Sequence, residues 1–241
     1  MAWFSRLLTD IPGIRHAFLN VHESAAFDQS RLVDIKQVHG AELLSLTEMP
    51  EQRPHVDGVI TSLTAQQIGI VTADCLPLLM ASRDGRVIAS VHAGWRGTAA
   101  GIVQQTVQQF AASGVEAKDI VVAIGPHIRA CCYEVSEAFY HTLLQMPARE
   151  IVNRNQERLF FRSPQHPNAL SARARENNSR WFDLPAFCLL HLQDLGIHAE
   201  NIDVLEKCTY CTPDELGSYR RRTHEPATKT QQISWMNKDS Q

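Results

Sequence analysis

The sequence predicts an α+β fold with mixed sheets. Three apolar runs with the character of strands (68–72, 76–80 and 87–91) follow one another with only short breaks between them. Two segments with helical features, 97–112 and 184–195, lie far from each other along the chain. Strands that are adjacent in sequence, mixed with occasional helices, favour an α+β arrangement over a doubly wound one.

Composition sets the size of the core and excludes several classes of protein. With 241 residues, of which 44% are hydrophobic and 20% charged, we expect a single domain over residues 1–241. A formal net charge of −3 offers no basic field for nucleic acid. The chain start has no signal-peptide pattern, and no apolar run approaches the roughly 20 residues of a membrane helix. Six cysteines are too few and too clustered for a disulfide framework, so we expect a reduced, cytoplasmic setting. Because of the net charge and the lack of a long apolar run, we expect neither nucleic-acid nor membrane partners.

The first predicted strands flank a bend and a turn. The apolar segments 68–72 and 76–80 are separated by residues 73–75, which we predict to form a bend. A turn at 83–86 then leads into the strand 87–91. These breaks are short enough for neighbouring strands to pair directly.

Helices and one more strand follow in the middle of the chain. Apolar residues recur with helical period over 97–112, and Gly114 marks the end of that helix. The run 120–124 predicts a strand, and 134–145 predicts a helix that ends near Pro147.

The last third begins with an irregular stretch. Residues 153–180 are polar, rich in arginine and weakly periodic, which predicts a long excursion. Asp183 is a suitable N-cap and Gly196 a suitable stop for the helix 184–195. The run 202–205 predicts a late strand.

Three residues able to bind metal lie where apolar, strand-like runs meet glycine-containing breaks: His39, Cys75 and His92. Rigid sheet edges commonly present reactive side chains at such places. Two imidazoles and one thiolate match a zinc site with three protein ligands, in which the fourth position stays open for water or substrate. A single histidine or cysteine in an apolar neighbourhood is more often structural, so the three contexts together indicate the site.

An anion site is indicated beside His92. Residues 93–97 contain two glycines and Arg96, whose guanidinium could hold a phosphate together with the N-terminus of the following helix. Packing of Trp95 and pairing of Arg96 with an acid explain the same spacing equally well. His127 is a further candidate for substrate or phosphate contact, with an ordinary loop histidine as the favoured alternative.

The remaining cysteine motifs favour structural roles. Vicinal cysteines seldom bridge each other, so we expect Cys131 and Cys132 to be packing or site-lining thiols. Cys208 and Cys211 have C-x-x-C spacing, but no second C-x-x-C completes a four-cysteine zinc site, and we expect a structural turn with reduced thiols. The basic run 218–222 is either solvated surface or a further anion contact.

Six motifs in fixed order resemble those of one protein family: residues 36–40, 57–61, 72–77, 91–97, 123–135, and 208–211 with 218–221. They are similar to the YfiH-like laccase-domain family, also called the multicopper polyphenol oxidase family. The resemblance extends from about Gly13 to Trp235. It implies a four-layer α/β/β/α sandwich.

The resemblance also sets expectations for function. Family members are regarded as purine nucleoside phosphorylases that act on adenosine, inosine, guanosine and 5′-methylthioadenosine, and that deaminate adenosine to inosine. The same activities are implied here, with purine nucleosides and phosphate as partners. His39, Cys75 and His92 match the family's zinc ligands and are the implied catalytic residues. The sequence makes no prediction about the oligomeric state.

Histidine spacing disfavours copper oxidation. A four-copper oxidase binds its trinuclear cluster through His-x-His pairs, and none of the eleven histidines lies two residues from another. Two histidines and one cysteine could imitate a type 1 copper site, so copper stays a less favoured metal than zinc.

Two other functions stay open. One is a thiol hydrolase or amidase with Cys75 as nucleophile and His92 or His39 as base, and the other is a zinc-binding module without catalysis.

The chain departs from the family pattern at two places. The Arg-Gly-Gly loop that usually follows the first His-x-Phe motif, here residues 16–18, is missing before Lys36. Residues 223–230 replace the usual Gly-x-Thr-Gly-Arg stretch. The metal-site motifs are intact, so we expect the differences at the periphery that contacts substrate.

Overall fold

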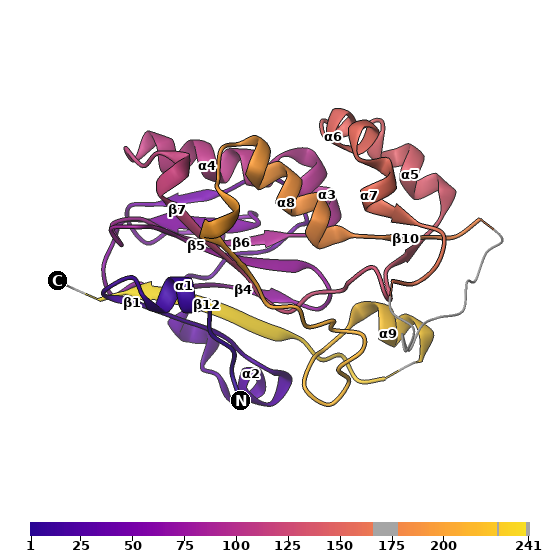
Figure 1. Ribbon diagram of the computed structural model, residues 1–241. Helices are drawn as coiled ribbons and strands as arrows, with labels where there is room; N and C mark the ends of the chain where they lie inside the picture. Colours follow the sequence, from indigo (N-terminus) through magenta and orange to yellow (C-terminus); the bar gives the residue numbers. More distant parts are fainter. Residues whose placement is uncertain (166–177, 226, 240–241) are drawn as a thin grey trace.

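Two β-sheets face each other between layers of helices in the computed structural model (Figure 1). The structure describes residues 1–165, 178–225 and 227–239. The strands, in chain order, are β1 (Ile14–Phe18), β2 (Leu44–Leu46), β3 (Gly58–Thr61), β4 (Ile68–Thr72), β5 (Leu76–Ser82), β6 (Ile88–Ala93), β7 (Ile120–Ile124), β8 (Glu134–Val135), β9 (Phe160–Phe161), β10 (Arg180–Phe182), β11 (Ile202–Val204) and β12 (Gln232–Lys238).

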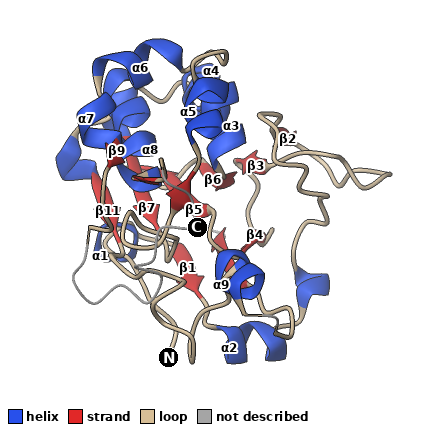
Figure 2. Ribbon diagram, turned by 90° about the vertical axis from the view of Figure 1, so that its right-hand side faces the viewer, coloured by secondary structure: helices blue, strands red, loops and turns tan. Residues whose placement is uncertain are grey.

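The helices lie on both outer sides of the paired sheets. In chain order they are α1 (Arg6–Thr9), α2 (Val21–Ala26), α3 (Trp95–Ala100), α4 (Ile102–Ala112), α5 (Glu137–Leu143), α6 (Arg149–Arg154), α7 (Gln156–Leu159), α8 (Leu184–Asp194) and α9 (Tyr219–His224). Short 3₁₀ turns lie at Gln29–Arg31, Ala117–Asp119 and Ala199–Asn201. Figure 2 shows helices α3 to α8 on one side of the strands and α2 and α9 on the other.

The larger sheet is mixed, as the sequence predicts. Its six strands have the order β11-β7-β5-β6-β3-β2. The central pairs are antiparallel, whereas the outermost pairs, β11 with β7 and β2 with β3, are parallel. A second sheet, β1-β12-β4, is antiparallel and packs against it, and a small sheet, β8-β10-β9, lies among the helices.

Two cores share the six-stranded sheet. On one face it packs against α3, α4 and α8, around the fully buried rings of Phe110, Phe182 and Phe187. On the other face it packs against the three-stranded sheet. Leu78 of β5 points into the first core and its neighbour Leu79 into the second. This explains why β5 is apolar without alternation, since both of its faces are buried. The α+β class and the layered α/β/β/α arrangement are therefore confirmed, and the shared sheet supports the single domain proposed for residues 1–241.

Several predicted elements match and two differ. The strands at 68–72 and 120–124 have the predicted bounds, and the helix predicted from residue 184 is capped by the side chain of Asp183, which accepts a hydrogen bond from the backbone N–H of Ala186. The helix predicted over 97–112 is wrong as one element. It begins at Trp95 and divides into α3 and α4 at Gly101, whose φ of 104° lies in the left-handed region.

The helix predicted over 134–145 begins later than expected. Residues Glu134–Val135 form β8, and α5 starts after Ser136, whose hydroxyl accepts a hydrogen bond from the backbone N–H of Phe139. Of the excursion predicted at 153–180, the described part carries the end of α6, all of α7 and β9, and the first residue of β10. Residues 166–177 lie outside the described residues.

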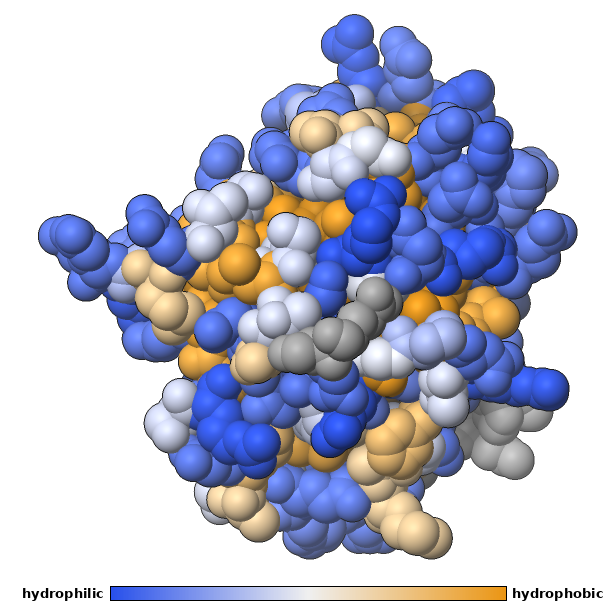
Figure 3. Space-filling model, turned by 90° about the vertical axis from the view of Figure 1, so that its left-hand side faces the viewer, coloured by the Kyte–Doolittle hydropathy of each residue, from blue (hydrophilic) through white to orange (hydrophobic). Residues whose placement is uncertain are grey.

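The surface carries few large apolar groups. Figure 3 shows one face of the molecule, where hydrophilic residues predominate and hydrophobic ones lie between them. Among the described residues, the exposed large hydrophobic side chains are spread over the chain: Met1, Phe4, Val38, Met49 and Tyr219. None of the described helices is both long enough and apolar enough to cross a membrane.

Candidate active site

Cys75 lies where the chain passes from one sheet to the other. Strand β4 belongs to the three-stranded sheet and β5 to the six-stranded sheet, so the predicted bend at 73–75 is the link between them. Asp74 has a φ of 95°, a left-handed conformation that turns the chain sharply just before the thiol. The side chain of Cys75 is half-buried at the edge of a cavity.

The register of β5 against β6 places His92 beside Cys75. Pro77 pairs with His92 and Leu76 with Ala93, so Gly94 follows opposite Cys75. A Cβ atom on Gly94 would lie 2.9 Å from Sγ of Cys75. A glycine is therefore required there for the thiol to keep its position.

His39 reaches the same place from an exposed loop. The side chain of Gln37 fastens this loop to β4 as a neighbouring strand would. Its Nε2 donates to the Val71 carbonyl (2.9 Å) and its Oε1 accepts from the Val71 N–H (2.8 Å). His39 has a φ of 60°, in the left-handed region. The imidazole rings of His39 and His92 meet edge to face, with their centroids 4.7 Å apart.

Asp57, which is not among the predicted site residues, organises both histidines. This carboxylate is fully buried just before β3. It accepts hydrogen bonds from the backbone N–H groups of Val38 (3.1 Å), His39 (2.9 Å) and Gly40 (2.7 Å). Its Oδ1 atom also lies 2.7 Å from Nδ1 of His92. One buried acid therefore holds the His39 loop and orients the His92 ring.

Electrostatics favour a charged pair at Cys75 and His92. Burial opposes ionisation of the thiol, but hydrogen bonding from His39 and His92 lowers the pKa of Cys75 to about 7. Burial likewise opposes protonation of the imidazole, but Asp57 and Cys75 raise the pKa of His92 to about 9. Hydrogen bonds from His92 and the backbone hold the pKa of Asp57 below its usual range despite its burial. A thiolate is the form of cysteine that acts as nucleophile or metal ligand.

The donor set fits a zinc ion. The ligand atoms of His39, Cys75 and His92 all lie within 4.8 Å of one another. Zinc bonds of about 2.0–2.3 Å in tetrahedral geometry place ligand atoms about 3.3–3.8 Å apart, so small side-chain movements suffice. Because Asp57 occupies Nδ1 of His92, Nε2 remains for the metal, the arrangement common in histidine–metal sites. The structure thus brings together all three ligands predicted from the sequence.

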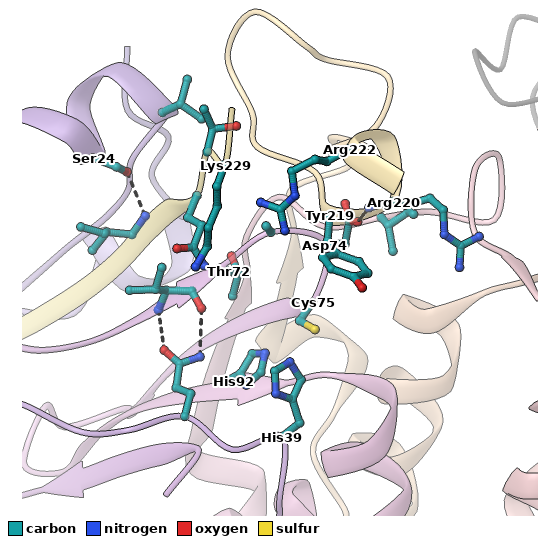
Figure 4. A pocket seen from close by; sticks show the side chains of 18 of the residues that line it. Ser24, His39, Thr72, Asp74, Cys75, His92, Tyr219, Arg220, Arg222 and Lys229 are labelled. Atoms are coloured by element: carbon teal, nitrogen blue, oxygen red, sulfur yellow. Dashed lines mark hydrogen bonds between the residues drawn. The ribbon is translucent and has the colours of Figure 1, made fainter. Parts of the chain in front are cut away.

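The cavity above these three residues has a volume of about 1030 Å³ and a cationic lining. Six basic side chains line it: Lys36, Arg53, Arg96, Arg220, Arg222 and Lys229. Asp74 is the one acidic lining residue in the described part of the chain. Its oxygens are occupied, since Oδ1 accepts from Oγ1 of Thr209 (2.6 Å) and Oδ2 from the backbone N–H of Arg220 (2.7 Å). In Figure 4, Tyr219, Arg222 and Lys229 lie across the cavity from His39, Cys75 and His92.

The structure separates the two residues predicted to bind phosphate. Arg96 lines the cavity, with its guanidinium 4.6 Å from the ring centre of Trp95, and among the described residues no acid pairs with it. His127 is completely buried, donates from Nδ1 to the Gly125 carbonyl (2.7 Å) and is not among the cavity-lining residues. A contact of His127 with substrate stays a prediction that this placement does not support.

The basic run 218–222 divides into two roles. Arg220 and Arg222 line the cavity. Arg221 instead donates to the carbonyls of Thr209 (2.7 Å) and Tyr210 (2.8 Å), which fastens α9 to the preceding turn. The sequence left two alternatives for this run, a solvated surface and a further anion contact, and neither describes the structural role of Arg221.

The fold and the site together define a class: a layered α+β protein with a His–Cys–His cluster able to hold a metal ion at the junction of two sheets, beneath a cationic cavity. The chain belongs to the family described as multi-copper polyphenol oxidoreductase laccase, whose model matches residues 13–235. The YfiH-like family predicted from the sequence is thereby confirmed.

Named relatives agree with this assignment. The chain is 31% identical over 198 residues to a purine nucleoside phosphorylase of Rickettsia conorii, which covers 82% of this chain and 74% of the relative. It is also 31% identical over 216 residues to a purine nucleoside phosphorylase of Synechocystis, covering 86% and 79% of the two chains. The crystal structure of YlmD from Geobacillus stearothermophilus shares the fold, with a TM-score of 0.74 over 98% of this chain and 94% of that chain at 24% identity.

Proposed function

We propose that this protein is a zinc-dependent purine nucleoside phosphorylase. The observation that carries the proposal is the position of the three-ligand site directly beneath a cavity with six basic lining residues. The names of the relatives as purine nucleoside phosphorylases support the reaction class. His39, Cys75 and His92 would hold the zinc ion. When bound, zinc would polarise a water molecule or substrate atom at the open fourth position.

The basic lining suits a phosphate co-substrate. Arg96 is the residue we assign to phosphate, because it lies four residues after His92, lines the cavity and has no acidic partner among the described residues. Arg222 and Lys229 approach from the opposite wall (Figure 4). Fixed cations of this kind bind and orient phosphate and stabilise the charge that develops during its attack.

The remaining lining suits the nucleoside. Trp95, Tyr133 and Tyr219 contribute aromatic rings to the cavity. Such rings offer faces for a purine base, since stacking needs only a π-face on each partner. A cavity of about 1030 Å³ also has room for a nucleoside together with phosphate.

The proposed reaction transfers the ribosyl group. A phosphate oxygen forms a bond to C1′ of the sugar while the bond between C1′ and the purine nitrogen breaks. The purine leaves with the electron pair and takes up a proton. The same cavity would bind adenosine for deamination, in which water replaces the amino group at C6 and ammonia leaves. Adenosine, inosine, guanosine and 5′-methylthioadenosine are the proposed phosphorolysis substrates.

Chromatography of nucleosides tests the proposal. Zinc-loaded protein is incubated with each nucleoside in the presence and absence of phosphate, beside Cys75→Ala and, as a matched control, Cys188→Ala. Cys188 is fully buried in α8 and is not among the cavity-lining residues. We expect phosphate-dependent release of free base by the wild type and the control but not by Cys75→Ala. Inosine from adenosine without phosphate would establish deamination. Absence of any conversion by zinc-loaded wild type contradicts the proposal.

A thiol hydrolase is the second candidate, and one observation favours it. The pKa of Cys75 is lowered to about 7 beside the His92 imidazole, as in enzymes with a cysteine–histidine pair. This candidate predicts labelling of Cys75 by iodoacetamide at neutral pH and an activity that survives chelation. The phosphorylase proposal predicts that zinc protects Cys75 from labelling and that chelation abolishes the activity.

A further inference from the structure

Four thiols gather at a second place in the fold: Cys131, Cys132, Cys208 and Cys211. None of these four residues lines the cavity. We refer to these residues as the four-cysteine cluster. No pattern in the sequence joins the vicinal pair to the C-x-x-C turn. The sequence predicts packing or site-lining thiols at Cys131 and Cys132 and a structural turn with reduced thiols at Cys208 and Cys211. The structure places the four Sγ atoms within 4.8 Å of one another.

The fold brings the two turns together through the parallel strands β7 and β11. Parallel strands end at the same edge of a sheet, and Ile124 at the end of β7 pairs with Val204 at the end of β11. The segments that follow stay in register, because the backbone N–H of His127 donates to the Lys207 carbonyl (3.1 Å) and that of Thr209 to the His127 carbonyl (3.0 Å). The backbone thus fixes the approach of both cysteine pairs.

The sulfur positions come close to those of a tetrahedral metal site. Four sulfur ligands at about 2.3 Å from a zinc ion lie about 3.8 Å from one another. Sγ of Cys211 lies 3.8 Å from Sγ of Cys131 and 3.2 Å from Sγ of Cys132. A disulfide needs about 2.05 Å between its sulfur atoms, so neither of these two pairs is a disulfide. Packing alone does not require four Sγ atoms from two separate turns to lie within 4.8 Å of one another, whereas binding of one metal ion does.

The surroundings suit a charged metal–thiolate centre. Cys131, Cys132 and Cys208 are buried, whereas Cys211 is half-buried and gives access from the surface. A divalent ion with four thiolates carries a net charge of −2, which needs a cation nearby. The guanidinium of Arg221 donates to the carbonyls of Thr209 and Tyr210, the two middle residues of the C-x-x-C turn. Partners beyond the ligands orient a metal site and balance its charge in this way.

We propose that the four-cysteine cluster binds one zinc ion as a structural site, separate from the zinc ion proposed for the triad of His39, Cys75 and His92. Four soft thiolates in tetrahedral arrangement with no open position are typical of structural zinc. The ion would join the turn after β7 to the turn after β11. It would thereby hold Thr209, which donates to Asp74 at the floor of the cavity.

Zinc stoichiometry of the intact protein tests the proposal. The full chain is purified under reducing conditions, saturated with zinc, dialysed and analysed by elemental and native mass spectrometry. We expect two zinc ions per chain in the wild type and in the Cys188→Ser control. Cys75→Ser should lose one ion, and the double variant C208S/C211S should lose the other. These separate losses distinguish failure of the structural site from failure of the proposed catalytic site.

Cobalt replacement provides a readout that does not depend on the folding of the double variant. Sulfur-to-cobalt charge-transfer absorption grows with the number of thiolate ligands, so Cys75→Ser loaded with cobalt should keep a strong, four-thiolate spectrum. A wild-type protein that retains no zinc beyond the ion lost in Cys75→Ser, or a cobalt form of Cys75→Ser without thiolate absorption, overturns the proposal. So does an intact mass lower by two hydrogens in zinc-saturated protein, which would show a disulfide within the cluster.

Discussion

Replacement of Asp57 by Asn should weaken both the fold and the metal site. The carboxylate receives two hydrogen bonds at each oxygen. Oδ1 faces the backbone N–H of His39 and Nδ1 of His92, and Oδ2 faces the N–H groups of Val38 and Gly40. An asparagine has one oxygen and one NH₂ group there. Either orientation of its amide sets the NH₂ group against at least one backbone N–H donor.

The size of the effect follows from these contacts. Hydrogen bonds to a charged group contribute about 1.5–3 kcal/mol each, and Asp57 is fully buried, so no water replaces the lost acceptor. Loss of two such bonds should lower the free energy of unfolding by about 3–5 kcal/mol, which corresponds to a fall in Tm of about 10 °C for a chain of this size. Because Asp57 also orients His92, the affinity for zinc should fall by about 10- to 100-fold.

Urea unfolding and zinc competition titration measure the two effects, with Asp10→Asn as the matched control. Asp10 is 69% exposed in an ion pair with Arg6, so its replacement should change the free energy of unfolding by less than about 1 kcal/mol and leave zinc affinity unchanged. If Asp57→Asn behaves like Asp10→Asn in both assays, the organising role of Asp57 is wrong. A loss of stability with unchanged zinc affinity would limit that role to the loop.

Three further predictions follow from single contacts. Gly94→Ala should reduce zinc affinity and nucleoside turnover while the chain stays folded, because the new Cβ would lie 2.9 Å from Sγ of Cys75; undiminished zinc affinity in a titration contradicts this. Phe110→Ala should lower the free energy of unfolding by about 3–5 kcal/mol in urea without changing zinc stoichiometry, since the ring is fully buried beneath α4, and a loss below about 1 kcal/mol refutes the packing argument. Burial lowers the pKa of His16 from 6.5 to about 4. Between these two pH values the unfolded chain therefore binds more protons than the folded one. The free energy of unfolding should be retained above pH 6.5 and should fall as the pH is lowered from 6.5 to about 4. At pH 5 this costs about 2 kcal/mol, and His16→Gln, whose amide oxygen can still accept the Ser5 N–H, should remove that part of the pH dependence in unfolding experiments; an unchanged dependence rejects it.

The elements that the sequence predicts well are those with one dominant local signal. The run 120–124 is buried on both faces in the structure, so its apolar character is continuous and its bounds are clear. The helix from Leu184 carries its own start signal in Asp183. Local signals were weaker where the prediction failed. Gly101 interrupts a periodic segment, and Ser136, the cap of α5, lies inside the range predicted as helix.

Contacts between distant segments were the least predictable part. The triad could be predicted because each ligand stands in a distinctive motif. Asp57 also begins one of the six motifs, 57–61, but nothing in that motif assigns it to the site. Its role appears only when β3 pairs with β6 and places it beside His92. The four-cysteine cluster joins residues 80 positions apart, and only the parallel pairing of β7 with β11 brings the two turns together. A search for C-x-x-C repeats along the sequence cannot find such a site.

Asp74 connects the two proposed metal sites and explains why a structural ion would matter for the cavity. Its φ of 95° is a conformation that costs about 1–3 kcal/mol for a residue other than glycine, so surrounding contacts must hold it. Its carbonyl accepts from the backbone N–H of Ile128 (2.9 Å), ahead of the vicinal cysteines, and its carboxylate accepts from Thr209 within the C-x-x-C turn. Both contacts come from the segments that the four-cysteine cluster would join. Release of that cluster would therefore free the residue that aims Cys75 at the cavity, although no atom of the triad is touched.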